Sequence, residues 1–323
     1  MRTFFSSLIA LTLLVSLSAG AAHAAAKPYP NEPLRIIVHT KPGSPMDALM
    51  RLWAKLMEQR VPVPVVVENK PGGGSAVQTT FVATAKKPDY TIAAVSNTQV
   101  STPLSNNTPN SLADMRPVSF LFEDPLLLVV KPEKPWKDAK DFFNDVKANP
   151  NKYMMGVAQV GSVDYLSVFY YTRNGYDYQV VPFDSGGETL TQLLGNHVDI
   201  AILEPSLVAG QIKAGKLRGL CSFTDQRLAS LPDVPTITEL GYPSVSMRQF
   251  RGMMLPKSAS DEAAKYLHGV FQDILKNSAE FHAYCKANER EIKVMSTEGY
   301  AEYLKNITAE TAKMLDSIGM LKK

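Results

Sequence analysis

The stretch LRIIVHTKPGSPMD, residues 34–47, runs from a strand-like segment directly into a helix start. Leu34–Val38 has the length and apolar content of a strand. After it, Ser44 suits the N-cap, Pro45 the first helical position and Asp47 the first turn. In an open α/β sheet, such a turn lies at the edge where ligands bind, and its free N–H groups favour an anion. The stretch therefore predicts an α/β fold with an anion site at this turn, although Ser44 and Asp47 could serve only as helix caps.

The same alternation of strand-length and helix-period segments continues outward from this stretch. Further strands are predicted at 63–67, 90–95, 126–130, 153–158, 179–181, 198–203 and 217–223. Helices are predicted around 49–56, after a capping box formed by Ser75 and Gln78, around 263–276 and at 297–318. The segment 101–110 is rich in Ser, Thr, Pro and Asn, which favours an irregular loop. The pattern is typical of a largely parallel sheet with helices on both faces.

The chain of 323 residues is long enough for two lobes, because a typical domain has roughly 100–150 residues. The apolar run beginning near Pro125 could carry the chain into a second lobe, and 217–223 could lead it back. We therefore expect domain 1 to be discontinuous, with residues 27–124 and 226–323, and domain 2 to cover 125–225. The two crossings, near 123–125 and 223–226, would form a hinge.

The N-terminal segment has the features of a secretory signal peptide. Arg2 supplies the positive start, 4–17 the apolar run, and Ala22-His23-Ala24 a small-x-small cleavage pattern. The apolar run is shorter than the roughly 20 residues that a bilayer span requires. We expect residues 1–24 to be removed and the mature protein to reside in the periplasm.

Composition argues against several other classes. The formal net charge of +3 is nearly balanced, so no nucleic-acid partner is expected. Gly72–Gly74 predicts a tight turn, because no Gly-Lys-Ser/Thr follows it. No metal or cofactor is expected, since four histidines lack the spacing of metal ligands: His39, His197, His268 and His282. Whether Cys221 and Cys285 pair is left open, since an exported protein could oxidise them but a chain of this length does not need a disulfide.

Two further helix starts fall in the predicted second domain. One follows Gln159-Val160-Gly161, with Ser162 as the cap. The other is a capping box formed by Ser185 and Glu188, directly after Asp184. Helix starts from both lobes could converge on one small anion, although each cap could be purely structural.

The ordered motifs of this chain resemble one family, the substrate-binding receptors of tripartite tricarboxylate transporters, also called Bug receptors. The resemblance covers nearly the whole mature chain. It rests on PLRIIV at 33–38, VVVENKPG at 65–72, GNHVD at 195–199, KAGKLR at 213–218, LPDVPT at 231–236 and Arg251-Gly252. One such string would be weak, but their shared order makes the resemblance specific.

The resemblance implies a two-lobed periplasmic-binding-protein fold of type II (Venus flytrap), with a mostly parallel sheet flanked by helices in each lobe. The loops at 41–47 and 161–162 would hold a ligand carboxylate through backbone amides, hydroxyls and water. Family ligands are di- or tricarboxylates, aromatic carboxylates or acidic amino acids, and the partners are membrane permease subunits. We expect a monomer without enzymatic activity. The predicted contacts are Lys41, Gly43, Ser44, Met46, Asp47, Ser96, Asn97, Gln159, Gly161, Ser162, Asp184 and Glu204.

The chain departs from the family pattern at two loops. Phe183-Asp184-Ser185 stands where relatives often have Tyr-Lys-Gly, and Lys41 enters the first loop. If Asp184 and Glu204 face the cleft, they repel a fully anionic ligand unless Lys41 offsets them, whereas an amine-bearing acid fits. Asp184 could instead be a solvated loop acid, and Glu204 a helix-start charge beside Pro205.

Two alternative functions remain at this stage. A receptor of this fold could report to a two-component sensor instead of feeding a permease. A serine hydrolase could use Ser162, Asp164 and His197, although the G-x-S-x-G nucleophile pattern is absent.

Overall fold

A computed structural model describes residues 28–158, 160–242 and 248–322. The predicted signal peptide and Gln159 lie outside the described residues. In the part of the chain that is described, no helix is both long and apolar enough to cross a bilayer.

The first lobe is built on a six-stranded sheet with the order β11-β4-β10-β3-β1-β2. β1 pairs in parallel with β2 and β3, while β10 runs antiparallel to β3 and β4. The strands are β1 (Leu34–Val38), β2 (Val65–Asn69), β3 (Thr91–Val95), β4 (Met115–Asp124), β10 (Gln249–Pro256) and β11 (Glu291–Ile292).

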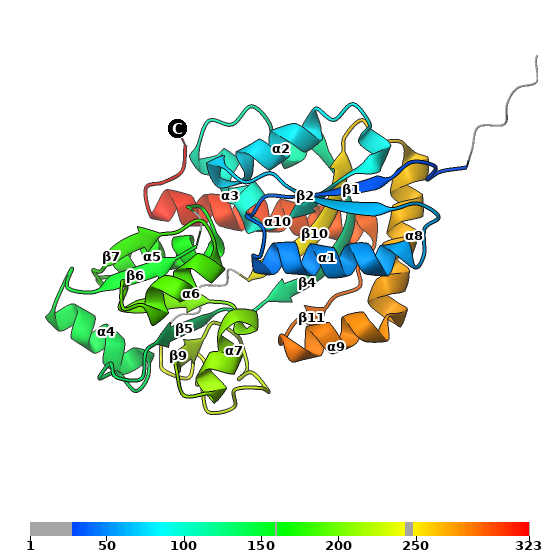
Figure 1. Ribbon diagram of the computed structural model, residues 1–323. Helices are drawn as coiled ribbons and strands as arrows, with labels where there is room; N and C mark the ends of the chain where they lie inside the picture. The colour runs from blue at the N-terminus through cyan, green and yellow to red at the C-terminus, as the bar shows by residue number, and fades with distance from the viewer. Residues whose placement is uncertain (1–27, 159, 243–247, 323) are drawn as a thin grey trace, which may run out of the picture.

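Helices pack around this sheet (Figure 1). They are α1 (Pro45–Glu58), α2 (Ala76–Ala83), α3 (Asn97–Ser105), α8 (Asp261–Asn277), α9 (Ala279–Ala287) and α10 (Thr297–Ser317), with short 3₁₀ turns at Gly73–Ser75, Pro88–Tyr90 and Leu112–Asp114. α1 packs through Trp53, whose ring lies 4.9 Å from that of Phe281 and 5.8 Å from that of Phe271. This buried aromatic cluster fixes α1 against α8 and α9, and thereby fixes the position of the turn before α1.

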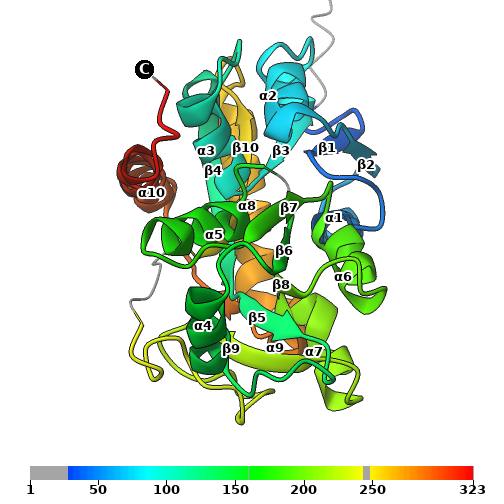
Figure 2. The same ribbon diagram turned by 90° about the vertical axis from the view of Figure 1, so that its left-hand side faces the viewer.

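The second lobe is built on a five-stranded sheet with the order β7-β6-β8-β5-β9. Its strands are β5 (Leu127–Val130), β6 (Met154–Val157), β7 (Gln179–Pro182), β8 (Ile200–Leu203) and β9 (Arg218–Ser222), and its helices are α4 (Ala139–Ala148), α5 (Val163–Arg173), α6 (Gly186–Leu194) and α7 (Pro205–Lys213). Figure 2 shows α10 of the first lobe passing beside α3 and α5, so the C-terminal helix also contacts the second lobe.

The two-lobed α/β fold is confirmed, but the prediction of mostly parallel sheets is wrong. Both sheets are mixed, because β5 runs antiparallel to β8 and β9, and β4 antiparallel to β10 and β11. The strands that carry the chain toward the other lobe and back, β4, β5, β9 and β10, all form antiparallel pairs. The strand on which the chain leaves a lobe lies beside the strand on which it returns, so the two strands run in opposite directions. Hydrophobic periodicity in the sequence does not reveal this pairing.

The strands β5 to β9 all belong to the second sheet, and the other strands to the first. This division agrees with the predicted discontinuous first domain. Packing extends the second lobe beyond the predicted boundary at 226. Leu228, Leu231 and Val234 join a core cluster with Leu127, and Ile237 joins another with the same sheet. The first sheet resumes only at β10. The domain boundaries themselves stay a prediction, to which this packing adds a later return point.

Two local predictions were wrong. The segment predicted as a loop at 101–110 is helical up to Ser105, because Ser96 and Gln99 form a capping box and residues 97–102 are buried. Ser75 does precede α2, but it adopts a left-handed conformation with φ of 78° and makes no side-chain cap. The Gln78 amide instead donates to the carbonyls of Ile37 and Ala94, tying α2 to the sheet.

The two cysteines are free thiols in separate cores, Cys221 in the second lobe and Cys285 in the first. Burial raises the pKa of both, that of Cys285 to about 12. Both are therefore packed apolar groups rather than a disulfide.

Candidate functional site

A cavity of about 50 Å³ lies between the two lobes, with room for a few water molecules. The first lobe contributes His39, Thr40, Ser44, Pro45, Met46, Thr98, Gln249 and Arg251. The second contributes Leu126, Ala158, Ser162, Asp164, Ser185, Gly186, Ile202, Leu203, Glu204 and Leu207. The lining is partly polar and partly apolar, as in most small-molecule sites.

Three helix N-termini, from α1, α5 and α6, meet at this cavity. In each, the cap serine accepts a hydrogen bond from the third helical residue: Ser44 from Asp47 N at 3.2 Å, Ser162 from Tyr165 N at 3.3 Å, and Ser185 from Glu188 N at 3.2 Å. The remaining first-turn N–H groups and the positive ends of the helix dipoles favour a negative group. The arrangement predicted from the sequence, with helix starts of both lobes at a shared gap, is therefore present.

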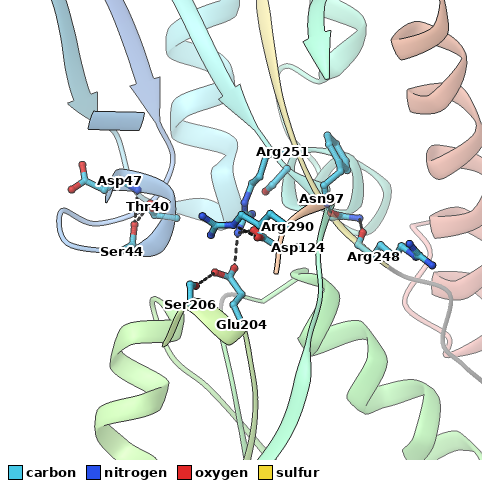
Figure 3. A network of polar contacts seen from close by, with 12 residues as sticks. Thr40, Ser44, Asp47, Asn97, Asp124, Glu204, Ser206, Arg248, Arg251 and Arg290 are labelled. Atoms are coloured by element: carbon cyan, nitrogen blue, oxygen red, sulfur yellow. Dashed lines mark hydrogen bonds and ion pairs between the residues drawn. The ribbon is translucent and has the colours of Figure 1, made fainter. Parts of the chain in front are cut away.

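Four charged side chains form a buried network beside the cavity (Figure 3). Arg251 Nη2 on β10 lies 2.5 Å from Glu204 Oε1, which comes from the start of α7 in the second lobe. The same nitrogen lies 2.9 Å from Asp124 Oδ2, and Asp124 also pairs with Arg290. Glu204 and Arg251 thus join the lobes through an ion pair at the wall of the cavity.

Burial controls the ionisation of the groups around this network. Burial raises the pKa of Glu204, and Arg251 partly opposes that effect. Burial also raises the pKa of Asp164, whose carboxylate accepts a hydrogen bond from Ala158 N. Burial and the charge of Arg251 lower the pKa of His39 to about 3. His39 is therefore neutral at physiological pH and adds no positive charge to the site.

Four of the predicted contacts line the cavity: Ser44, Met46, Ser162 and Glu204. Lys41 and Asp184 do not line it and instead form an ion pair with each other. Their side chains are 54% and 65% exposed, so this pair bridges the two lobes at the solvent-facing rim.

Asp47 and Gly43 stabilise the loop at 41–47 by contacts outside the cavity. The Asp47 carboxylate accepts hydrogen bonds from Gly43 N at 2.9 Å and from Asn69, and it pairs with Arg51. Burial opposes the ionisation of Asp47, but these hydrogen bonds hold its pKa below the usual value. Gly43 has φ of 81°, a conformation that favours glycine. These contacts give the loop a fixed shape, while neither Asp47 nor Gly43 lines the cavity.

Ser96, Asn97 and Gly161 also lie outside the lining. Ser96 caps α3 with Gln99. The Asn97 side chain accepts from Phe250 N and donates to the carbonyl of Arg248, which pins α3 to β10. The carbonyl of Gly161 accepts a hydrogen bond from the Ser101 hydroxyl, a second contact between the lobes. The ligand-binding roles predicted for these residues stay predictions.

The sequence reasoning missed Arg251 as a site residue, together with Thr98, Gln249 and Asp164. Arg251 carried a signal: it is a charged residue inside the apolar run of β10, where its side chain is 4% exposed. A charged residue buried this deeply requires a partner. The identity of that partner could not be read from the sequence, because Glu204 and Asp124 come from distant segments.

The residues of the hydrolase alternative are not assembled. Ser162 is occupied as the cap of α5, and Asp164 accepts from the backbone of Ala158. His197 is exposed in the turn after α6. Among the described residues, no hydrogen bond joins Ser162 to a histidine, and no cluster of three potential metal ligands occurs.

Comparison with known proteins agrees with this architecture. The family described as "Tripartite tricarboxylate transporter family receptor" matches residues 49–320. Protein BugT of Bordetella pertussis is 27% identical over 282 residues, 86% of this chain and 86% of that protein. The structure of the periplasmic binding protein BugD has a TM-score of 0.85 at 24% identity, over 91% of this chain and 100% of that one. R. palustris Rpa4515 with adipate has a TM-score of 0.84 at 22% identity, over 90% and 98%. The resemblance seen in the sequence is thus confirmed, and the chain belongs to the tripartite tricarboxylate transporter receptor family.

Proposed function

We propose that this protein is a periplasmic solute-binding receptor that captures a small carboxylate between its lobes and presents it to the permease subunits of a tripartite tricarboxylate transporter. One observation carries the proposal: the N-termini of α1, α5 and α6, from both lobes, meet at one cavity. The related fold described with adipate supports a carboxylate ligand. The predicted leader at 1–24 supports export.

The ligand carboxylate would be held by neutral donors rather than by a free cation. In α1, Pro45 has no N–H and Asp47 N donates to Ser44, so Met46 N is the first-turn donor. First-turn N–H groups of α5 can donate from the other lobe, and the hydroxyl of Thr40 lies 2.5 Å from that of Ser44 at the same cavity. A carboxylate bound in this way gains charge-assisted hydrogen bonds from each lobe. Donors contributed by both lobes favour the closed arrangement over the open one.

The lobes are closed in this structure. Lys41 pairs with Asp184, Ser101 donates to Gly161, and Arg251 pairs with Glu204. The cavity between these contacts is small, at about 50 Å³, so we expect the ligand to enter an opened form. We expect opening about the two crossings near 123–125 and 223–226, and a shift of the population toward closure when the ligand binds.

A thermal-shift screen of the purified mature protein against aliphatic and aromatic carboxylic acids tests carboxylate capture. A ligand that binds only the native state raises its melting temperature, by an amount set by its concentration relative to Kd. The matched control is the primary amide of each acid, which keeps the shape and removes the charge. Stabilisation by at least one acid but not by its amide supports the proposal. A screen in which no acid raises the melting temperature contradicts it.

The output of the receptor is tested separately. Large and small permease genes beside the coding sequence, and loss of uptake of the bound acid when the receptor gene is deleted, support a transport role. A neighbouring two-component system, with unchanged uptake and a lost transcriptional response after deletion, would replace transport by sensing.

A further inference from the structure

Arg251 is the one cationic side chain that lines the cavity among the described residues, and its charge is already neutralised. Asp124 forms ion pairs with both Arg251 and Arg290, so one carboxylate is shared by two guanidinium groups. Glu204 supplies the second negative charge, 2.5 Å from Arg251. The network of two arginines and two acids is therefore balanced without a ligand.

Glu204 is held in this position by its surroundings. It is the last residue before α7, with Pro205 fixing the backbone of the first helical position. Its carboxylate does not cap the helix and instead points to Arg251, with Ser206 Oγ 3.3 Å from its second oxygen. In the amide orientation that satisfies both neighbours, Gln249 donates to Glu204 at 2.9 Å and accepts from Arg251 at 2.8 Å. These contacts leave Glu204 little freedom to turn away.

We propose that Glu204 is a specificity-determining residue of the cleft. Its carboxylate forms an ion pair with Arg251, so Arg251 is not free to bind a ligand carboxylate. The cleft therefore accepts ligands with one carboxylate and rejects a second carboxylate at the Arg251 end. This inference rests on the proposed function, because it concerns the ligand of the same cleft.

Electrostatics gives the reason for the rejection. A second ligand carboxylate near Arg251 would lie beside Glu204, and two like charges in a site of low dielectric repel strongly. Rejection through an unfavourable charge is a common source of specificity. Lys41 cannot offset this repulsion, because it is exposed at the rim and paired with Asp184.

The apolar part of the lining fits the same ligand class. Met46, Leu126, Ile202, Leu203 and Leu207 all line the cavity near the polar groups. A ligand whose carboxylate meets the helix N-termini would place its remaining atoms against these side chains. The structure thus favours a monocarboxylate with an apolar body over a dicarboxylate of equal length.

The test compares acids that differ only in the second carboxylate: butyrate with succinate, hexanoate with adipate, and benzoate with terephthalate. Calorimetric Kd values are measured at pH 8 for the wild type, Glu204→Gln and the control Glu68→Gln. Glu68 is a matched control because it also pairs with an arginine, Arg35, but lies on β2 outside the cavity.

For the wild type, we expect at least one monocarboxylate to bind at least tenfold more tightly than its dicarboxylate partner. In Glu204→Gln, Arg251 gains an unbalanced positive charge, so this ratio should fall at least tenfold, whereas Glu68→Gln should leave it unchanged. The inference is overturned if the wild type binds dicarboxylates as tightly as monocarboxylates, a comparison that needs no variant to fold. It is also overturned if folded Glu204→Gln keeps the wild-type ratio. A wild type that binds no acid of either series contradicts the proposed function itself.

Discussion

Among the ion pairs that join the lobes in the described residues, Arg251–Glu204 and Lys41–Asp184 differ mainly in their exposure to water. Arg251 and Glu204 are buried at the cavity wall, whereas Lys41 and Asp184 are more than half exposed at the rim. A buried charge that loses its partner retains its full desolvation cost, while an exposed charge is restored to solvent. The buried pair should therefore control stability and ligand choice, and the exposed pair should control neither.

The largest effect is expected from Arg251→Met. The substitution leaves Asp124 and Glu204 buried with one cation fewer, and removal of one partner from a buried ion pair costs about 3–5 kcal/mol. Urea unfolding at neutral pH should show this loss in the free energy of unfolding. A loss below about 1 kcal/mol, the range of exposed pairs, would break the contrast between the two regions.

The next effect concerns His39, a neutral group in the same buried region. Its pKa is lowered from 6.5 to about 3, so between these pH values His39 is protonated in the unfolded chain but neutral in the folded protein. This contribution to stability is present above pH 6.5 and is lost as the pH falls toward 3, by up to about 1.4 kcal/mol per pH unit.

Unfolding free energies of the wild type and His39→Gln between pH 7 and pH 4 measure this contribution. The difference between the two proteins isolates His39 from Glu204 and Asp164, whose raised pKa values act in the opposite direction. Parallel pH profiles of the two proteins would show that His39 titrates normally in the folded state.

A smaller effect is expected from Ser101→Ala, at another buried contact between the lobes. The Ser101 hydroxyl donates to the Gly161 carbonyl, and loss of one neutral hydrogen bond costs about 0.5–1.5 kcal/mol. Small-angle scattering should show a larger mean dimension for the unliganded variant, because the lost bond joins α3 of the first lobe to the turn before α5 of the second. Identical scattering of variant and wild type would mean that this bond does not affect closure.

The smallest effect is expected from Asp184→Ala. The Lys41–Asp184 pair is exposed, so the melting temperature should change by no more than about 1 °C and the Kd of any bound acid by less than about twofold. Calorimetry with the same acids measures the second quantity. A tenfold change in affinity would show that Asp184 takes part in ligand binding and would remove the distinction between rim and wall.

Local features of the fold could be predicted from the sequence, whereas contacts between distant segments could not. Leu34–Val38 and the Ser44 cap were predicted correctly, because strand length and capping chemistry are local properties. The helix at α3 was missed, since its Ser-, Thr- and Pro-containing sequence favours a loop and burial against the first lobe overrides that preference. The convergence of helix starts followed from topology alone.

The partners of the charged groups could not be predicted. Glu204 was named as a possible cleft acid, but nothing local indicated that Arg251 would neutralise it across the lobes. Lys41 was expected to offset Asp184 and Glu204 in the cleft, whereas the structure pairs it with Asp184 at the rim. Pairings of this kind depend on three-dimensional proximity, which periodicity and capping do not report.

A crystal structure with a stabilising monocarboxylate shows whether a carboxylate binds between the helix starts of the two lobes. We expect carboxylate oxygens within about 3 Å of backbone nitrogens at the starts of α1 and α5, with Glu204 still paired to Arg251. Density for the acid elsewhere, such as the separate cavity beside Asp225 and Arg248, with the space between Ser44 and Ser162 holding only water, would show that the helix starts do not bind the ligand.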